Sequence, residues 1–174
     1  MTIVQQRPRG PTASLAAAMT AAALLAAAAP SQAKADEVIT HVAIAAPRAR
    51  VWAILTDFPS YPSWNPFIRR IEGKLAVGEE INADLHTTNL KPMAVKAKIL
   101  IVDPNTQLRW LGRLPGLFSG EHYWKLTDRP DGGTDLEQGE VFRGLMVPFI
   151  KPERLRVDYE AMNAAMKARA ETAP

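Results

Sequence analysis

Residues 57–67 read Asp-Phe-Pro-Ser-Tyr-Pro-Ser-Trp-Asn-Pro-Phe and separate two parts of the chain whose apolar residues repeat with different periods. The three prolines of this segment break a regular helix, because proline lacks a backbone N–H donor and its ring clashes with the preceding turn. The segment is therefore predicted to be a broken helical turn or a loop.

The residues before this segment predict one strand and one short helix. Residues 37–45 alternate in polarity as a strand does, and Pro47 fits the first turn of a helix, where its missing N–H needs no partner. The apolar face of that helix is formed by Val51, Trp52, Leu55 and Phe58.

The residues after the segment predict six strands and one long helix. The strands are expected at 68–75, 80–87, 93–103, 106–113, 117–128 and 134–144. Short Gly-, Pro- and Asn-containing connections make neighbouring strands antiparallel. From Pro152 onward the apolar residues form one helical stripe, which comprises Leu155, Tyr159, Met162, Met166 and Ala170. A helix that covers a core explains this stripe better than a helix lying on a membrane surface. The expected fold class is α+β, with a seven-stranded antiparallel sheet and a long C-terminal helix.

The composition excludes several kinds of site. The 174 residues include no Cys, which excludes disulfides, a thiol nucleophile, Cys-ligated zinc and an iron–sulfur cluster. The three His residues are not within helical reach of one another, and no phosphate-binding or dinucleotide-binding glycine pattern is present. We therefore expect no cofactor and no metal.

The excess positive charge lies entirely in the first 35 residues. The net charge is +3, and Arg7, Arg9 and Lys34 account for it, so that the remaining residues are neutral and do not favour nucleic-acid binding. The two arginines precede an apolar run at 15–29, which is followed by Ala33-Lys34-Ala35. This order is typical of a secretory signal peptide, with cleavage expected after Ala35 or, as a second choice, after Ala33. The alternatives are an uncleaved apolar anchor and a disordered tail. We expect a signal peptide at 1–35, one domain at 36–174, and a periplasmic or secreted protein without a stable membrane anchor.

Three polar residues are expected on the apolar face of the last two strands. If the hairpin is centred on Asp131, Leu126 lies opposite Leu136, Trp124 opposite Gln138, and His122 opposite Glu140. Burying three polar groups without partners is costly. Two explanations, which can hold together, are that His122 and Glu140 satisfy each other and that the polar groups face a cavity that is otherwise apolar.

The other strands supply apolar residues to the same face. Ile81, Ala83 and Leu85 share one face, and so do Met93, Val95, Ala97, Ile99 and Ile101. Ala83 and Ala97 are small, which favours a hollow core over a dense one. The residues expected to line a cavity are Asn65, Ala83, Val95, Ala97, Trp110, His122, Trp124, Gln138, Glu140, Phe142 and Met162.

The chain resembles the START-like superfamily, which includes polyketide cyclases/dehydrases and lipid-transport proteins with a helix-grip fold. The resemblance rests on Ala46–Phe58, on Tyr61-Pro-Ser-Trp-Asn-Pro-Phe67, on Phe118-Ser-Gly-Glu-His122 and on Gly139-Glu-Val-Phe-Arg-Gly-Leu145. It implies a seven-stranded sheet wrapped around the C-terminal helix. It also implies a deep apolar cavity for lipids, sterols, polyketides or similar molecules. Members of the superfamily range from carriers and sensors to cyclases, so that the fold defines the kind of ligand better than the reaction.

Three functions remain open at this point. The first is an exported monomer that binds a small hydrophobic ligand and neither nucleic acid nor a membrane. The second is a cyclase or dehydratase in which His122 acts as general base and Glu140 orients it. The third is an accessory protein whose cavity is collapsed.

Overall fold

The computed structural model describes residues 36–172, so that the predicted signal peptide lies outside the described residues. The elements follow one another in the order β1 (Asp36–Ile44), α1 (Arg48–Thr56), the 3₁₀ helix η1 (Phe58–Ser63), β2 (Ile68–Gly73), β3 (Glu80–Leu85), β4 (Met93–Asp103), β5 (Gln107–Leu114), β6 (Phe118–Asp128), β7 (Thr134–Arg143), α2 (Val147–Ile150), the 3₁₀ helix η2 (Pro152–Leu155) and α3 (Arg156–Glu171). The predicted strands and long helix are confirmed. Strands β2 and β3 each end two residues earlier than predicted.

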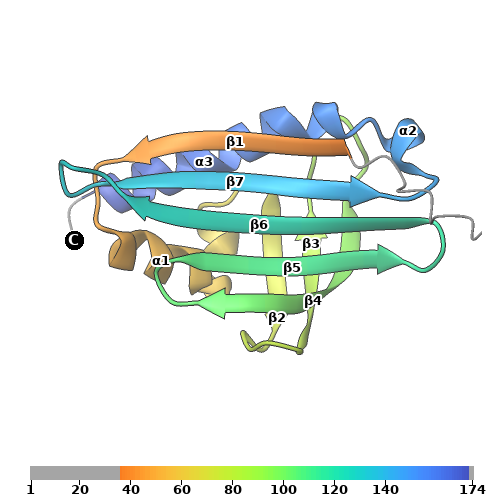
Figure 1. Ribbon diagram of the computed structural model, residues 1–174, viewed down its shortest axis with the longest axis horizontal. Coiled ribbons are helices and arrows are strands. Elements are labelled where there is room, and N and C mark those ends of the chain that lie inside the picture. The colour runs from red at the N-terminus through yellow and green to blue at the C-terminus, as the bar shows by residue number, and fades with distance from the viewer. Residues whose placement is uncertain (1–35, 173–174) are drawn as a thin grey trace, which may run out of the picture. The chain divides into compact units, whose positions relative to one another are not determined.

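All seven strands form one antiparallel sheet in the order β1-β7-β6-β5-β4-β3-β2. Figure 1 shows that the sheet curves, so that β2 and β3 run behind β4 and β5. Helix α3 lies along the inner side of β1 and β7. This is the predicted α+β helix-grip architecture. Helix α3 packs mainly against β1, so that the inner face of β3 to β6 is left for other contacts.

The apolar stripe of η2 and α3 faces the core as predicted. Leu155, Tyr159, Met162, Met166 and Ala170 are all buried. The regular helix is shorter than the five turns expected, because Pro152–Leu155 is a 3₁₀ turn and α3 itself has 16 residues. The sequence analysis missed α2, which has only four residues and is too short to show a helical period.

The proline-rich segment forms η1 and is closed by two side chains. Tyr61 is fully buried, and its hydroxyl donates a hydrogen bond of 2.6 Å to the carbonyl of Leu55. Oδ1 of Asn65 accepts hydrogen bonds from the backbone N–H groups of Phe67 (3.0 Å) and Ile68 (2.9 Å). Asn65 thereby sets the direction in which the chain enters β2, which is the turn-closing role typical of asparagine.

A β-bulge in β4 corrects one predicted face. Ile99 lies opposite Trp110, but Ile101 lies opposite Arg109, so that one extra residue is inserted between them. After the bulge, Val102 lies opposite the buried Leu108 and packs against the core. The expectation that Ile101 shares the inner face with Ala97 and Ile99 is therefore wrong, because an inserted residue exchanges the two faces of a strand.

Candidate functional site

The hairpin of β6 and β7 places the three predicted polar residues on the inner face. The register pairs Leu126 with Leu136, Trp124 with Gln138, and His122 with Glu140, which confirms the prediction. The turn is tight at Gly132, whose positive φ of 83° favours glycine. Because the register is correct, His122, Gln138 and Glu140 all point toward α3.

These residues form one hydrogen-bonded cluster with a tyrosine of α3. Nδ1 of His122 lies 3.0 Å from Oε2 of Glu140, and Nε2 of Gln138 lies 3.0 Å from Nε2 of His122. The hydroxyl of Tyr159 donates a hydrogen bond to the same Oε2 of Glu140. Both explanations offered by the sequence thus hold together: the His–Glu pair satisfies itself, and a cavity adjoins it.

The partners of the two ring nitrogens define which tautomer of His122 fits this arrangement. An amide nitrogen can only donate, so Nε2 of His122 accepts from Gln138 in this arrangement of the amide. A neutral ring that accepts at Nε2 carries its proton on Nδ1, which then donates to Glu140. Both nitrogens of His122 are engaged, and the residue is only 4% exposed.

Aromatic rings hold the imidazole in place. Trp124 stacks on His122 with ring centroids 4.2 Å apart, and Trp110 lies 5.9 Å away on the neighbouring strand. Tyr159 approaches from α3 at 5.0 Å. The ring plane is therefore defined by packing as well as by hydrogen bonds.

A cavity of about 440 Å³ opens beside this cluster, inside the curved sheet. Its wall is mostly apolar and includes Phe67, Ile68, Leu85, Leu90, Met93, Val95, Gly112, Leu114, Phe118, Gly120, Met146, Ile150 and Leu155. The polar or charged residues of its lining are Thr87, Lys96, Arg113, His122 and Glu140, and of these only His122 is buried. A cavity with an apolar wall and a few convergent polar groups is the usual form of a small-molecule site.

The structure brings seven of the predicted site residues to the cavity wall. They are Ala83, Val95, Ala97, Trp110, His122, Glu140 and Phe142. The two alanines occupy adjacent strands and are small and buried, as expected for residues that leave space. Whether these residues contact a ligand stays a prediction.

The other four predicted residues do not line this cavity. Asn65 closes the turn before β2, and Trp124 is fully buried behind the His122 ring. Gln138 points to His122, and its amide nitrogen also lies 3.5 Å from the sulfur of Met162. Trp124 and Gln138 share the inner face with the cavity wall, and the amide of Gln138 is covered by Met162 of α3.

Two residues that matter for the site were missed by the sequence analysis. Tyr159 was assigned only to the apolar stripe, although a buried tyrosine hydroxyl usually finds a partner. The sequence analysis assigns no role to Gly120. A Cβ added there would lie 2.1 Å from Oε1 of Glu140, so that the absence of a side chain makes room for the carboxylate.

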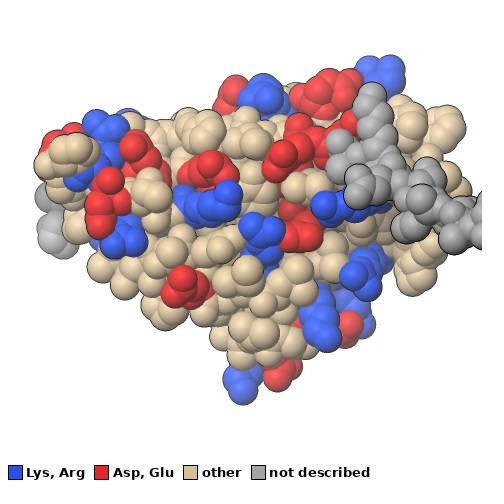
Figure 2. Space-filling view, viewed as in Figure 1, with Lys and Arg blue, Asp and Glu red and all other residues tan. Residues whose placement is uncertain are grey.

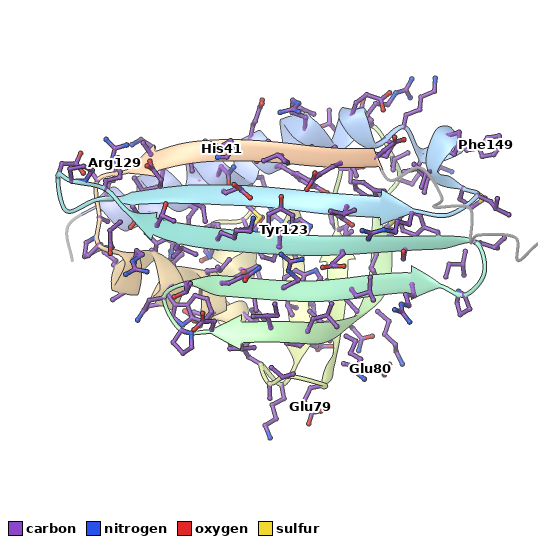
Figure 3. The ribbon with its side chains drawn as sticks, in the orientation of Figure 1. His41, Glu79, Glu80, Tyr123, Arg129 and Phe149 are labelled. Atoms are coloured by element: carbon purple, nitrogen blue, oxygen red, sulfur yellow. The ribbon has the colours of Figure 1, made fainter. Side chains whose placement is uncertain are left out.

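Exposed apolar side chains surround one end of the cavity. Leu114 and Met146 line it and are themselves exposed, and Leu145 and Phe149 nearby are 75% and 78% exposed. Figure 3 shows Phe149 projecting away from α2. The cavity therefore opens near α2 and the turn between β5 and β6.

The outer face of the sheet carries charges of both signs. Figure 2 shows basic and acidic side chains interspersed over β5, β6, β7 and β1. Several of them pair, including Lys125 with Glu137 at 2.9 Å and Arg129 with Asp135 at 3.0 Å. Within residues 36–172, no group of three potential metal-ligating side chains occurs, and no helix is long and apolar enough to cross a membrane.

A second depression lies between α1 and α3, away from the polar cluster. It is an open surface groove of about 740 Å³, bordered by Arg50, Asp57, Trp64 and Arg169. None of the predicted site residues borders it, so the enclosed cavity is the better candidate.

Solved structures share the fold at low sequence identity. The Zhui aromatase/cyclase from Streptomyces sp. R1128 superimposes with a TM-score of 0.66 at 14% identity, over 79% of this chain and 94% of that one. A START superfamily protein from Mycobacterium smegmatis superimposes with a TM-score of 0.59 at 21% identity, over 78% and 97%. The di-domain aromatase/cyclase BexL from the BE-7585A biosynthetic pathway gives 0.66 at 14%, over 80% of this chain and 51% of BexL, so that the chain spans about half of that protein.

Sequence comparison gives a family but no individual relative. No curated protein matches the chain. The model of the family described as polyketide cyclase / dehydrase and lipid transport matches residues 35–172, which is most of the chain. The START-like resemblance is thereby confirmed, and the chain belongs to the polyketide cyclase / dehydrase and lipid transport family.

Proposed function

We propose that the protein binds a small, largely apolar molecule in the cavity between the sheet and the helical segment 146–155. The observation that carries this proposal is the apolar cavity of about 440 Å³ with the carboxylate of Glu140 in its wall. Its volume falls in the range of about 300–1,000 Å³ that is usual for ligand pockets.

The stability that a protein loses by containing an apolar cavity supports the proposal. An apolar void inside a protein forfeits packing contacts and lowers stability. Larger side chains at Ala83 and Ala97 would fill this one, since both residues are buried in its wall. Alanine at both positions leaves this space open for a ligand.

A second candidate function is catalysis of the cyclase or dehydratase type; the Zhui and BexL neighbours are named as aromatase/cyclases. The observation that favours it is a carboxylate in the cavity wall that is oriented by His122 and Tyr159. In this arrangement Glu140, and not His122, has an atom free to take a proton, because both imidazole nitrogens are already engaged. General-base catalysis would then be assigned to Glu140.

We also propose that the protein acts outside the cytoplasm, as a monomer that carries, stores or senses its ligand. The support is the order of charged, apolar and small residues at 1–35. Native mass spectrometry of the protein, expressed from its full chain and purified from the periplasm or medium, tests both parts. We expect a single subunit with a bound apolar molecule; recovery only of ligand-free protein after gentle isolation would contradict the binding proposal.

A further inference from the structure

We propose that the ligand carries a hydrogen-bond donor, such as an alcohol, phenol or amine, and that Oε1 of Glu140 accepts it. This inference rests on the proposed binding function and specifies the chemical class of the ligand. The donor group would stand on an otherwise apolar molecule, since the rest of the inner wall is mostly apolar.

The first step of the argument is that one oxygen of Glu140 is saturated and the other is free. Oε2 accepts from Nδ1 of His122 and from the hydroxyl of Tyr159, which uses both of its lone pairs. Oε1 has no hydrogen-bond partner among the residues that the structure describes, while Glu140 itself lines the cavity. The side chain of Glu140 is 15% exposed, whereas that of His122 is 5% exposed.

The second step is that the fold makes room for this oxygen. Gly120 also lines the cavity, and a Cβ at Gly120 would lie only 2.1 Å from Oε1. Any other residue at this position of β6 would displace the carboxylate. Gly120 therefore lets Oε1 reach the surface of the cavity wall.

The third step is that neither neighbour of Glu140 has a donor left for Oε1. Tyr159 remains a donor, because burial and the charge of Glu140 raise its pKa well above the ordinary value for tyrosine. His122 donates through Nδ1 because Gln138 occupies Nε2. Both donors are committed to Oε2, so that the partner of Oε1 comes from the cavity, as water or as a ligand group.

The chemistry of the free oxygen then selects the ligand. An ionised carboxylate only accepts hydrogen bonds, and a ligand that displaces water from Oε1 without donating to it is bound at a cost. A hydroxyl or amine removes that cost with a charge-assisted hydrogen bond. A ketone or ether placed against Oε1 would instead bring lone pairs against lone pairs and would bind more weakly.

The test begins with the wild-type protein and two probes of nearly the same shape. 2-Naphthol has a donor, whereas 2-methoxynaphthalene has only an acceptor. Calorimetric titration at neutral pH should give tighter binding of 2-naphthol by about 10-fold, as expected for a hydrogen bond to a charged group. Equal affinities would overturn the inference and leave the cavity function intact. Failure of both probes to bind would overturn the binding function and the inference with it.

The variant Glu140→Gln makes the test sharper. His122 and Tyr159 both donate, so they will hold the amide oxygen at the position of Oε2, and the amide NH₂ will take the position of Oε1. The free acceptor becomes a donor, and the preference should reverse in favour of 2-methoxynaphthalene. Glu137→Gln is the matched control, because Glu137 lies three residues away on β7 and pairs with Lys125 at 2.9 Å. This control should bind both probes as the wild type does.

Gly120→Ala gives a second, independent variant. The added methyl group competes for the space of Oε1, so that the preference for 2-naphthol should fall to within about twofold while near-UV circular dichroism shows a folded protein. An undiminished preference in both Gly120→Ala and Glu140→Gln would overturn the inference. If either variant fails to fold, the comparison of the two probes on the wild-type protein decides alone.

Discussion

His122 and Glu140 lie directly opposite each other on β6 and β7, with Nδ1 of the imidazole 3.0 Å from Oε2 of the carboxylate. This pair joins the packed core to the cavity. On one side of it Trp124 and Gln138 fill the interior, and on the other side Glu140 lines the cavity. The stability of the sheet and the chemistry of the cavity therefore depend on the same two residues.

Removal of the imidazole should destabilise the fold. His122→Leu leaves Gln138 without its acceptor and takes one of two donors from Oε2 of Glu140. We expect the free energy of unfolding in urea to fall by about 1–3 kcal/mol, the usual cost of buried polar groups left without partners. The double variant His122→Leu/Glu140→Gln should recover part of this loss, because it removes the buried charge.

The matched control for this variant is His41→Leu. His41 is exposed on β1 and points outward (Figure 3), so that its replacement should change stability by no more than about 0.5 kcal/mol. A similar loss of unfolding free energy in His122→Leu and His41→Leu would mean that the hydrogen bonds of His122 do not stabilise the fold.

The tyrosines should resist ionisation until the protein unfolds. The chain has three, and burial is the largest cause that raises the pKa of Tyr61, Tyr123 and Tyr159 above the ordinary value of 10.0. For Tyr123, which lies on the outer face of β6 (Figure 3), a hydrogen bond of 3.0 Å to Glu37 adds to this effect.

The direction of the pH dependence follows from these raised pKa values. Their contribution to stability is fully present below pH 10 and is lost as the pH rises above it, because the unfolded chain then releases protons that the folded chain retains. Tyrosinate absorbance and far-UV circular dichroism should therefore change together in an alkaline titration. Ionisation of all three tyrosines near pH 10 in a protein that is still folded would contradict this description of the core.

The bulge in β4 predicts that two adjacent residues differ in their tolerance of charge. Val102→Asp places a carboxylate against the core, whereas Ile101→Asp places it on the outer side of the sheet. Val102→Asp should cost at least about 2 kcal/mol more in thermal or urea unfolding. A larger loss of stability in Ile101→Asp than in Val102→Asp would mean that β4 has no bulge and that Ile101 points inward, as the sequence predicts.

Export should leave a defined N-terminus. All of the excess charge and the apolar run lie before Asp36, so that N-terminal sequencing of the mature protein should begin at Asp36, or at Lys34 if cleavage follows Ala33. Intact Met1 in a membrane fraction would instead indicate an uncleaved anchor.

The sequence was sufficient to predict those parts of the fold that depend on local periodicity. The alternation in β6 and β7, together with the glycine turn at Gly132, fixed the register that pairs His122 with Glu140. The bulge after Ile99 could not be predicted, because apolar residues occupy both faces of β4 there.

The residues that line the cavity could be predicted only in part. Alternation along a strand predicts which side chains point inward, but it does not predict which of these are packed over and which border the cavity. Trp124 and Ala97 share the inner face, but the first packs behind the ring of His122 and the second lines the cavity. The contact between Tyr159 and Glu140 joins positions 19 residues apart on a helix and a strand, and no periodicity predicts such a contact.

The central claim, that the cavity binds an apolar ligand, is tested most directly by filling it. Ala97→Trp puts a large ring into the cavity wall, whereas Ala43→Trp puts the same ring on the exposed side of β1. The binding of a solvatochromic dye, 8-anilinonaphthalene-1-sulfonate, should be measured by fluorescence on the wild type and on both variants, with unfolding curves as the check on folding. We predict one dye per protein for the wild type and for Ala43→Trp, and no binding by a folded Ala97→Trp. Equal binding by all three, or none by a folded and ligand-free wild type, would contradict the claim.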